Sequence, residues 1–231
     1  MSAGIDYLFG RNFTEETLRE FSAMYFKDNQ LSVIPDSLHG DFIMHVKSLL
    51  QPVPPDTISK FDDCVLFPVL DLYNKFITIF ARRLNGAPKF DALPYDKKSI
   101  VYGLNKSYDY ILNRNNVFVV EGIFDCMMLW QYGIRNVVTP LGCSLSYEQM
   151  CLLARFTNTF TVIFDPDQAG RDGMLKAKLM LTKHGYKCNT VFVPEGLDVD
   201  DYVVKYGIER FLQNAKNSST LQKYTVGGGI Y

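Results

Sequence analysis

Between positions 116 and 196 the chain alternates short apolar segments with longer segments of helical character. The apolar segments cover 116–122, 136–142, 159–165 and 188–196, and the helical segments between them cover 123–133, 146–156 and 170–185. Strands that alternate with helices of about ten to fifteen residues form βαβ units, whose crossovers are right-handed. The pattern therefore predicts a parallel sheet flanked by helices.

Local signals mark the ends of these helices. Ser146 is followed three residues later by Gln149, which is the signature of a capping box. Gly133 and Gly185 stand where two of the helices should end. The segment 198–216 is also predicted to be helical, with a break near Gly207.

The first half of the chain is richer in polar breaks. Segment 14–26 is predicted to be a helix capped by Thr14, and segment 64–84 to be two strands joined by a turn near 73–75. Basic residues outnumber acidic ones between positions 75 and 106. The basic residues are Lys75, Arg82, Arg83, Lys89, Lys97, Lys98 and Lys106, and the acidic ones are Asp91 and Asp96.

The polar stretch NRNN at 113–116 is the expected boundary between the two halves. We expect an α/β fold in which a mixed α+β basic subdomain at 1–113 precedes the parallel sheet and its helices at 114–208. A C-terminal helix and tail would occupy 209–231.

Composition indicates a globular protein with a substantial core, because 47% of the 231 residues are hydrophobic and 21% are charged. The formal net charge is -1, so a nucleic-acid-binding surface would have to be local. The sequence shows neither an apolar run long enough to span a membrane nor a signal-peptide pattern. We expect a cytoplasmic protein with no membrane partner.

The five cysteines include no C-x-x-C pair, and the three histidines are scattered along the chain. This pattern predicts neither a disulfide framework nor structural zinc. Buried free thiols in a reducing compartment are the expected state.

Acidic residues stand at the carboxyl ends of three predicted strands. Glu121 ends the first strand, Asp165 and Asp167 end the third, and Asp198, Asp200 and Asp201 follow the fourth. Ligands of parallel α/β sheets bind beyond the carboxyl ends of the strands, so these side chains should converge at one edge. Pro166 favours an extended conformation at Asp165, which points Asp165 and Asp167 to the same side.

Each acidic motif also has an ordinary structural reading. The DPD at 165–167 fits a turn followed by a helix cap, and the DVDD at 198–201 fits a solvated helix start. Three such motifs at three strand ends favour a metal site. Crowded carboxylates raise one another's pKa, and a divalent cation relieves their repulsion. We expect Mg²⁺ or Mn²⁺, bound as two ions suited to phosphoryl transfer.

Three stretches together resemble the Toprim domain in the form found in DnaG-type bacterial and phage DNA primases. They are VVEGIFD at 119–125, VIFDPDQAGRDG at 162–173 and PEGLDVDDYV at 194–203. Upstream, VLFPVLD, IFARRLNGAPKF and KKSIVYGL resemble the basic subdomain that precedes Toprim in these primases. The resemblance covers roughly residues 6–215 and implies DNA-templated synthesis of short RNA primers during DNA replication.

The resemblance also implies roles for individual residues. The catalytic set is Glu121, Asp165 and Asp167, and the metal-binding set adds Asp198 and Asp200 to these three. The nucleotide- or DNA-binding set is Arg82, Arg83, Lys89, Lys97, Asp125 and Arg171. Glu121 would ligate metal or act as a general acid or base, and the sequence leaves these roles open.

The chain departs from the family's pattern at Pro166, Gln168 and Cys64, where the family usually has glycine, arginine and arginine. No zinc-binding module precedes the core in this sequence, so priming by the chain alone is expected to be weak and little selective for sequence. The expected partners are single-stranded DNA and ribonucleoside triphosphates, with the replicative helicase or a separate zinc-bearing protein as further candidates.

Two other functions remain open at this point. A Toprim nuclease would use the same acids to cut nucleic acid, although the upstream basic segments favour a primase. A primase relative without catalytic activity would only bind nucleic acid or a replication partner, although the retained acids argue against it. A phosphatase of the D-x-D-x-T type fits less well, because Gln168 stands where that motif needs Thr or Val.

Overall fold

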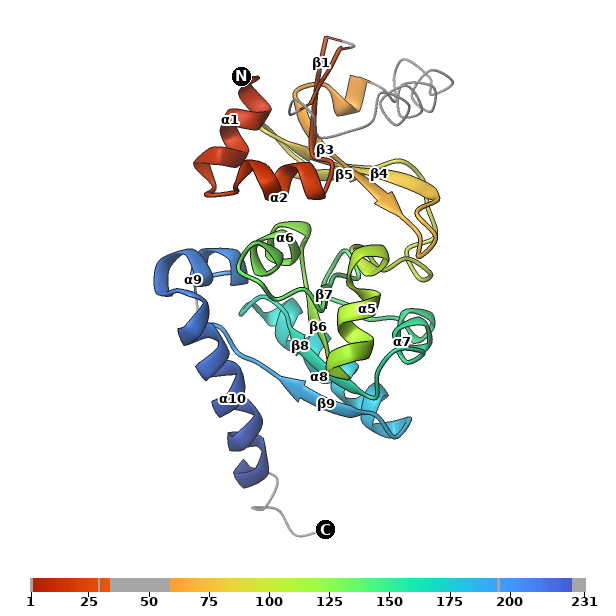
Figure 1. Ribbon diagram of the computed structural model, residues 1–231, viewed down its shortest axis with the longest axis vertical. Coiled ribbons are helices and arrows are strands. Elements are labelled where there is room, and N and C mark those ends of the chain that lie inside the picture. Colours follow the sequence, from red (N-terminus) through yellow and green to blue (C-terminus); the bar gives the residue numbers. More distant parts are fainter. Residues whose placement is uncertain (1, 29, 34–58, 195, 226–231) are drawn as a thin grey trace. The chain divides into compact units, whose positions relative to one another are not determined.

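The computed structural model describes residues 2–28, 30–33, 59–194 and 196–225, with side chains described up to 216 in the last helix. The chain forms two compact units, one of Met1–Leu70 with Lys75–Tyr95 and one of Asp71–Asn74 with Asp96–Tyr231 (Figure 1). The units therefore divide at 95/96 rather than at the 113/114 boundary expected from the sequence. Helix α5 (Leu104–Arg114) belongs to the second unit because it buries Leu104 and Ile111 in that unit's core.

The first unit is built on an antiparallel sheet with the strand order β2-β1-β3-β4-β5. Its elements are α1 (Ala3–Gly10), α2 (Glu15–Glu20), β1 (Met24–Lys27), β2 (Gln30–Val33), the 3-10 turn η1 (Ser59–Phe61), β3 (Cys64–Leu70), β4 (Phe76–Arg83) and β5 (Phe90–Ala92). Strands β3 and β4 confirm the two strands and the intervening turn predicted for 64–84.

The helix predicted for 14–26 is correct only in its first half. Thr14 caps α2 by accepting a hydrogen bond from the backbone N–H of Thr17, but the helix ends at Glu20. Ser22 has a φ of 54°, which is incompatible with helix continuation. Residues 24–26 then pair with both β2 and β3, because the apolar side chains of Met24 and Phe26 are buried in this unit's core.

The second unit contains a four-stranded parallel sheet with the order β7-β6-β8-β9, which confirms the predicted parallel sheet. Besides α5, its elements are β6 (Val117–Val120), α6 (Ile123–Gln131), β7 (Val137–Val138), α7 (Tyr147–Leu153), β8 (Thr159–Ile163), α8 (Gln168–Lys183), β9 (Lys187–Thr190), α9 (Val199–Tyr206) and α10 (Ile208–Thr225). Strand β9 is shorter than the segment 188–196 predicted for it.

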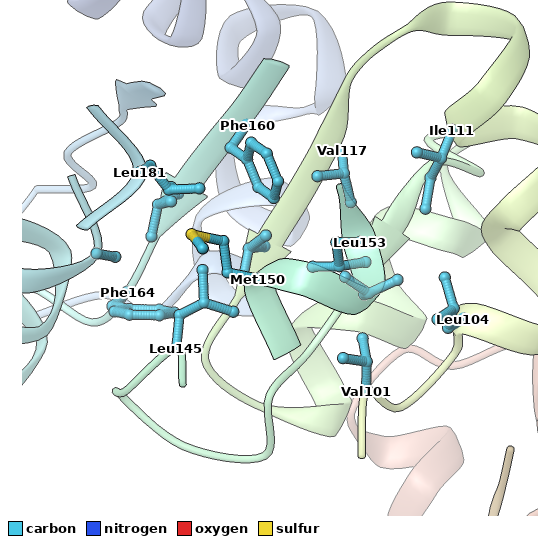
Figure 2. Close-up of a cluster of buried hydrophobic side chains, with 14 of the residues drawn as sticks. Val101, Leu104, Ile111, Val117, Leu145, Met150, Leu153, Phe160, Phe164 and Leu181 are labelled. Carbon is cyan, nitrogen blue, oxygen red and sulfur yellow. The ribbon is translucent and has the colours of Figure 1, made fainter. Parts of the chain in front are cut away.

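Helices cover both faces of the parallel sheet, as right-handed crossovers require. Helices α5, α7 and α8 share one cluster of buried side chains with strands β6, β7 and β8 (Figure 2). Val117 and Val119 of β6 and Phe160 and Val162 of β8 point into this cluster. Helix α6 packs against α9 outside it. Among the described residues, no helix has both the length and the apolar character needed to cross a membrane.

The predicted helix ends are found at the marked residues. Gln149 donates its backbone N–H to Ser146 Oγ at 3.0 Å, and the backbone N–H of Ser146 donates to Gln149 Oε1 at 2.8 Å. Gly133 and Gly185 follow the ends of α6 and α8 with φ angles of 90° and 83°. Gly207, with a φ of 82°, separates α9 from α10, which confirms the predicted break.

Candidate metal centre

The strand order places two acidic side chains at the reversal point of the parallel sheet. The connection from β6 runs to β7 on one side, and the next connection returns to β8 on the other side of β6. Ligands of open α/β sheets bind at this point, beyond the carboxyl ends of the strands. Glu121 directly follows β6, and Asp165 follows β8. The backbone N–H of Asp165 donates to Glu121 Oε2 at 3.1 Å, so the two residues are in direct contact.

A second group of carboxylates comes from the first turns of two helices. Oxygen atoms of Asp125, Asp198 and Asp200 all lie within 4.8 Å of one another. The Asp125 side chain accepts hydrogen bonds from the backbone N–H groups of Gly122 at 3.0 Å and Asp200 at 3.1 Å. Asp125 therefore joins the start of α6 to the start of α9, with only 5% of its surface exposed.

The two groups of carboxylates interact electrostatically. Burial raises the pKa of Asp165 to about 7, and the charges of Glu121 and Asp198 act in the same direction. Burial and a hydrogen bond with Asp200 raise the pKa of Asp198 to about 6. Burial, followed by the charge of Asp200, raises the pKa of Asp125 well above its ordinary value. Burial also raises the pKa of Glu121.

Two of the predicted metal ligands are also helix caps. Asp167 Oδ1 accepts the backbone N–H of Gly170 at 2.7 Å at the start of α8. Asp198 Oδ1 accepts the backbone N–H of Asp201 at 3.1 Å at the start of α9. The turn-and-cap interpretation of the DPD motif is therefore correct. The DVDD motif does start a helix, but this start is not solvated throughout, because only 2% of the Asp200 surface is exposed. Capping occupies only part of each aspartate. It is compatible with metal binding, because a carboxylate has two oxygen atoms.

The acidic residues fit a divalent cation. Asp165 Oδ1 is buried and has no hydrogen-bond partner among the described residues. Leaving a buried carboxylate oxygen without a partner is unfavourable, and a cation would supply that partner. The surrounding donors are carboxylate oxygens, the hard ligands that Mg²⁺ prefers.

We refer to Glu121, Asp125, Asp165, Asp167, Asp198 and Asp200 together as the acidic edge. Five of these residues were predicted from the sequence as catalytic or metal-binding. Asp125 was instead predicted to contact nucleotide or DNA, and the structure places it among the carboxylates. Its signal in the sequence is a single acid in the otherwise apolar segment IFDCMMLW, one helical turn beyond Glu121.

Sequence reasoning missed Thr139, which holds the end of β6 in place. Thr139 Oγ1 donates to the carbonyl oxygen of Glu121 at 2.6 Å, and the backbone N–H of Gly142 donates to the same oxygen at 3.0 Å. Thr139 is fully buried. A threonine in a short apolar strand carries no distinctive signal, so this role becomes visible only once the two strand ends are adjacent.

Three of the predicted nucleotide- or DNA-binding residues lie in the first unit. Arg82 and Arg83 are neighbours on β4, so their side chains point to opposite faces of the sheet. The Arg82 guanidinium lies 4.8 Å from the centre of the Phe90 ring, and Arg83 pairs with Asp91 at 3.3 Å. Lys89 precedes β5 and is exposed.

Lys97 and Arg171 lie in the second unit, and both are exposed. Arg171 is in the first turn of α8 and donates a hydrogen bond to the carbonyl oxygen of Pro166, between Asp165 and Asp167. The backbone of Lys97 is held by Gln149 of α7.

The raised pKa of Asp165 predicts how the stability of the metal-free protein depends on pH. A folded-state pKa above the unfolded value contributes stability below about pH 4, and this contribution is lost as the pH rises through 7. After allowance for partial exposure, the effect of this residue is about 1–2 kcal/mol. In a buffer with chelator at pH 7.5, we expect Asp165→Asn to raise Tm by roughly 2–6 °C, and at pH 4 to have little effect.

A matched control for this prediction is Asp172→Asn, which makes the same change on the exposed surface of α8. Thermal melts of both variants and the wild type at the two pH values provide the measurement. An Asp165→Asn variant that is stabilised equally at pH 4 and pH 7.5, or destabilised at pH 7.5, would contradict the raised pKa of Asp165.

Sequence comparison relates this chain to known proteins. Residues 118–203 match the Toprim-like family. The DNA primase of Aquifex aeolicus is 30% identical over 222 residues, a match that covers 93% of this chain and 44% of that primase. The chain spans less than half the length of the curated relatives it matches.

Solved structures show the same relationship. A DNA primase domain from Pseudomonas aeruginosa has a TM-score of 0.74 and 30% identity, over 93% of this chain and 71% of that domain. A DnaG primase catalytic domain bound to ssDNA has a TM-score of 0.73 and 25% identity, over 92% of this chain and 70% of that domain. The Toprim-like region contains all six residues of the acidic edge, at the reversal point of the parallel sheet. The chain belongs to the family of DnaG-type DNA primases.

Proposed function

We propose that this chain catalyses DNA-templated synthesis of short RNA primers. The observation that supports the proposal most strongly is the contact of Glu121 with Asp165 at the sheet's reversal point, beside the cluster of Asp125, Asp198 and Asp200. In the reaction, the 3′-hydroxyl oxygen of the growing primer attacks the α-phosphorus of the next ribonucleotide, and pyrophosphate leaves.

We assign metal binding to Asp165, Asp167, Asp198 and Asp200, with Glu121 as a further ligand or as the general base. Two ions, Mg²⁺ or Mn²⁺, would supply charge neutralisation at the phosphates when bound. Burial raises the pKa of Glu121, which makes its carboxylate a stronger base toward the proton of the 3′-hydroxyl than an exposed glutamate would be. We assign to Asp125 a positioning role, because its two backbone hydrogen bonds, from Gly122 and Asp200, tie the start of α9 to the start of α6.

Basic residues would hold the phosphates of template and nucleotide. The solved catalytic domain bound to ssDNA supports single-stranded DNA as the template. Lys89 and Lys97 are exposed and free to reach a backbone phosphate as point charges. Arg83 forms an ion pair with Asp91, so we expect it to contribute less to DNA affinity than the two lysines. Arg82 and Arg171 complete the set.

Removing both lysines should weaken binding to single-stranded DNA. We expect a Lys89→Ala/Lys97→Ala double variant to lose affinity and to show a salt dependence whose slope is smaller by about 1.4, since each phosphate contact on a single strand contributes about 0.7. Fluorescence anisotropy with a labelled oligonucleotide over a series of salt concentrations would measure both quantities.

The matched control is a Lys183→Ala/Lys187→Ala double variant. Both lysines are exposed. Lys187 is the first residue of β9, so it lies at the amino ends of the parallel strands, whereas the acidic edge lies at their carboxyl ends. The control removes the same charge but should leave affinity and slope near the wild-type values. Equal losses in the two double variants would mean that DNA binding follows net charge and not the proposed residues.

A combined synthesis and degradation assay tests the proposed function. The protein is incubated with single-stranded DNA, labelled ribonucleotides and Mg²⁺ or Mn²⁺, and both RNA products and template length are followed. We expect short RNA products on intact template. Template degradation without RNA would support a Toprim nuclease, and binding without either product would support a relative that lacks catalytic activity.

Further partners would adjust this activity. Contacts to phosphates are largely blind to sequence, so we expect little sequence preference from the chain alone. The replicative helicase or a separate zinc-bearing protein would raise rate or selectivity by adding contacts and effective concentration. Priming on a panel of templates, with and without these partners, would measure the difference.

A further inference from the structure

The amide of Gln149 makes more contacts than its helix cap requires. Only 1% of the Gln149 surface is exposed. Its Oε1 atom completes the capping box of α7 by accepting the backbone N–H of Ser146. Its Nε2 atom lies within hydrogen-bond distance of three carbonyl oxygens outside the helix: those of Lys97 at 3.0 Å, Ile100 at 2.6 Å and Pro140 at 3.4 Å.

The other member of the capping box makes a similar contact. Ser146 Oγ accepts the backbone N–H of Gln149 and donates to the carbonyl oxygen of Lys98 at 2.8 Å. The start of α7 therefore holds the backbone at three positions of the segment 97–100. The side chains of Lys97 and Lys98 are exposed, so this backbone attachment leaves their ammonium groups available to a ligand.

The segment 97–100 lies at the carboxyl end of β7. Tyr102 forms an antiparallel bridge with Thr139, through N–H to carbonyl bonds of 2.9 and 3.1 Å. Because the bridge is antiparallel, the residues before Tyr102 extend past the carboxyl end of β7. Thr139 also donates to the carbonyl oxygen of Glu121. One hydrogen-bonded network thus connects the backbone of Lys97 to the strand end that carries Glu121.

We infer that Gln149 is a positioning residue that fixes Lys97 and Lys98 beside the acidic edge, where their ammonium groups meet phosphate oxyanions. This inference rests on the proposed function. The oxyanions belong either to the triphosphate of the incoming ribonucleotide or to the backbone of the DNA template, and each is a ligand that lysine binds as a point charge. If Gln149 only stabilised the second unit, the effect of replacing it on ligand binding would not depend on Lys97 and Lys98.

Two substitutions test the hydrogen bonds that the Gln149 amide donates to the carbonyl oxygens outside α7. Gln149→Glu keeps an oxygen that accepts the Ser146 N–H but cannot donate to the three carbonyls when ionised. Gln149→Met keeps the approximate size of the side chain and introduces no charge. It takes the place of Gln149→Glu in the experiment if the new buried carboxylate prevents that variant from folding. Glu148→Gln is the control, because Glu148 is the exposed neighbour on the same helix.

The experiment measures ribonucleotide KM and kcat, affinity for single-stranded DNA, and hydrogen–deuterium exchange of the peptide spanning 97–103. We expect the Gln149 variants to raise the ribonucleotide KM or the DNA Kd about tenfold, with kcat changed less than about threefold, and to speed exchange in this peptide. An effect on KM identifies the triphosphate, and an effect on Kd identifies the template. Glu148→Gln should match the wild type.

A double-mutant cycle tests whether the effect passes through the lysines. In a Lys97→Ala/Lys98→Ala background, the Gln149 substitution should cause no further change in KM or Kd. Additive losses, or unchanged KM, Kd and exchange in a folded Gln149 variant, would overturn the inference. If the wild type makes no RNA, the proposed function fails, but DNA affinity and exchange still decide the role of Gln149.

Discussion

Glu121→Gln is expected to reduce RNA synthesis by at least about a hundredfold while the protein stays folded. The loss follows from removing one charge at the reversal point of the sheet, where reacting phosphates and their cations would gather. The fold should persist because the glutamine Oε1 can still accept the backbone N–H of Asp165, which lies 3.1 Å from Glu121 Oε2 in the wild type. Product formation on a single-stranded template and a thermal melt measure the two effects.

The matched control is Glu148→Gln, the same replacement at an exposed position on α7. It should leave synthesis close to the wild-type rate. The melting temperature of Glu121→Gln should equal or slightly exceed that of the wild type, because a charge leaves a repulsive cluster. Wild-type synthesis by a folded Glu121→Gln protein would remove Glu121 from the active site.

Gly170→Ala is expected to destabilise the second unit by about 2–3 kcal/mol, lowering its Tm by roughly 5–10 °C. A Cβ atom at Gly170 would lie 2.1 Å from the carbonyl oxygen and 2.9 Å from the backbone nitrogen of Asp165. Both neighbours are backbone atoms, so either the start of α8 or the end of β8 must move. The contact between Asp165 and Glu121 depends on that strand end, and synthesis should fall as well.

Gly10→Ala provides the control for this substitution. Gly10 also lies in a helix, and an added Cβ there would meet no atom within 4 Å. The control should be neutral or slightly stabilising, because alanine favours helix more than glycine does. A Gly170→Ala protein that melts within about 1 °C of the wild type would show that α8 does not need this close approach.

The sequence predicted the second unit well because its strands and helices are locally distinct. Apolar runs that end in glycine or an acid, such as VFVVEG, identify both the strand and its carboxyl end. The parallel order then brings Glu121 next to Asp165 without any knowledge of side-chain contacts. The capping box at Ser146 and the break at Gly207 are likewise local features.

Other features depend on contacts between distant segments. Residues 24–26 have the apolar character of the helix predicted there, but pairing with β2 and β3 makes them a strand. Helix α5 begins after Gly103 without a side-chain cap, and its buried Ile111 packs in the core of the second unit. Asp125 joins the carboxylates of Asp198 and Asp200 only because α9 returns to α6 across 75 positions of the chain.

Titration with Mn²⁺ tests the central claim, that the acidic edge binds divalent cations, most directly. Electron paramagnetic resonance would follow free Mn²⁺ with the wild type, Asp165→Asn and Asp172→Asn, each with and without single-stranded DNA. We predict two bound ions in the wild type and in Asp172→Asn, and the loss of at least one ion in Asp165→Asn. Equal Mn²⁺ binding by all three proteins would contradict the account.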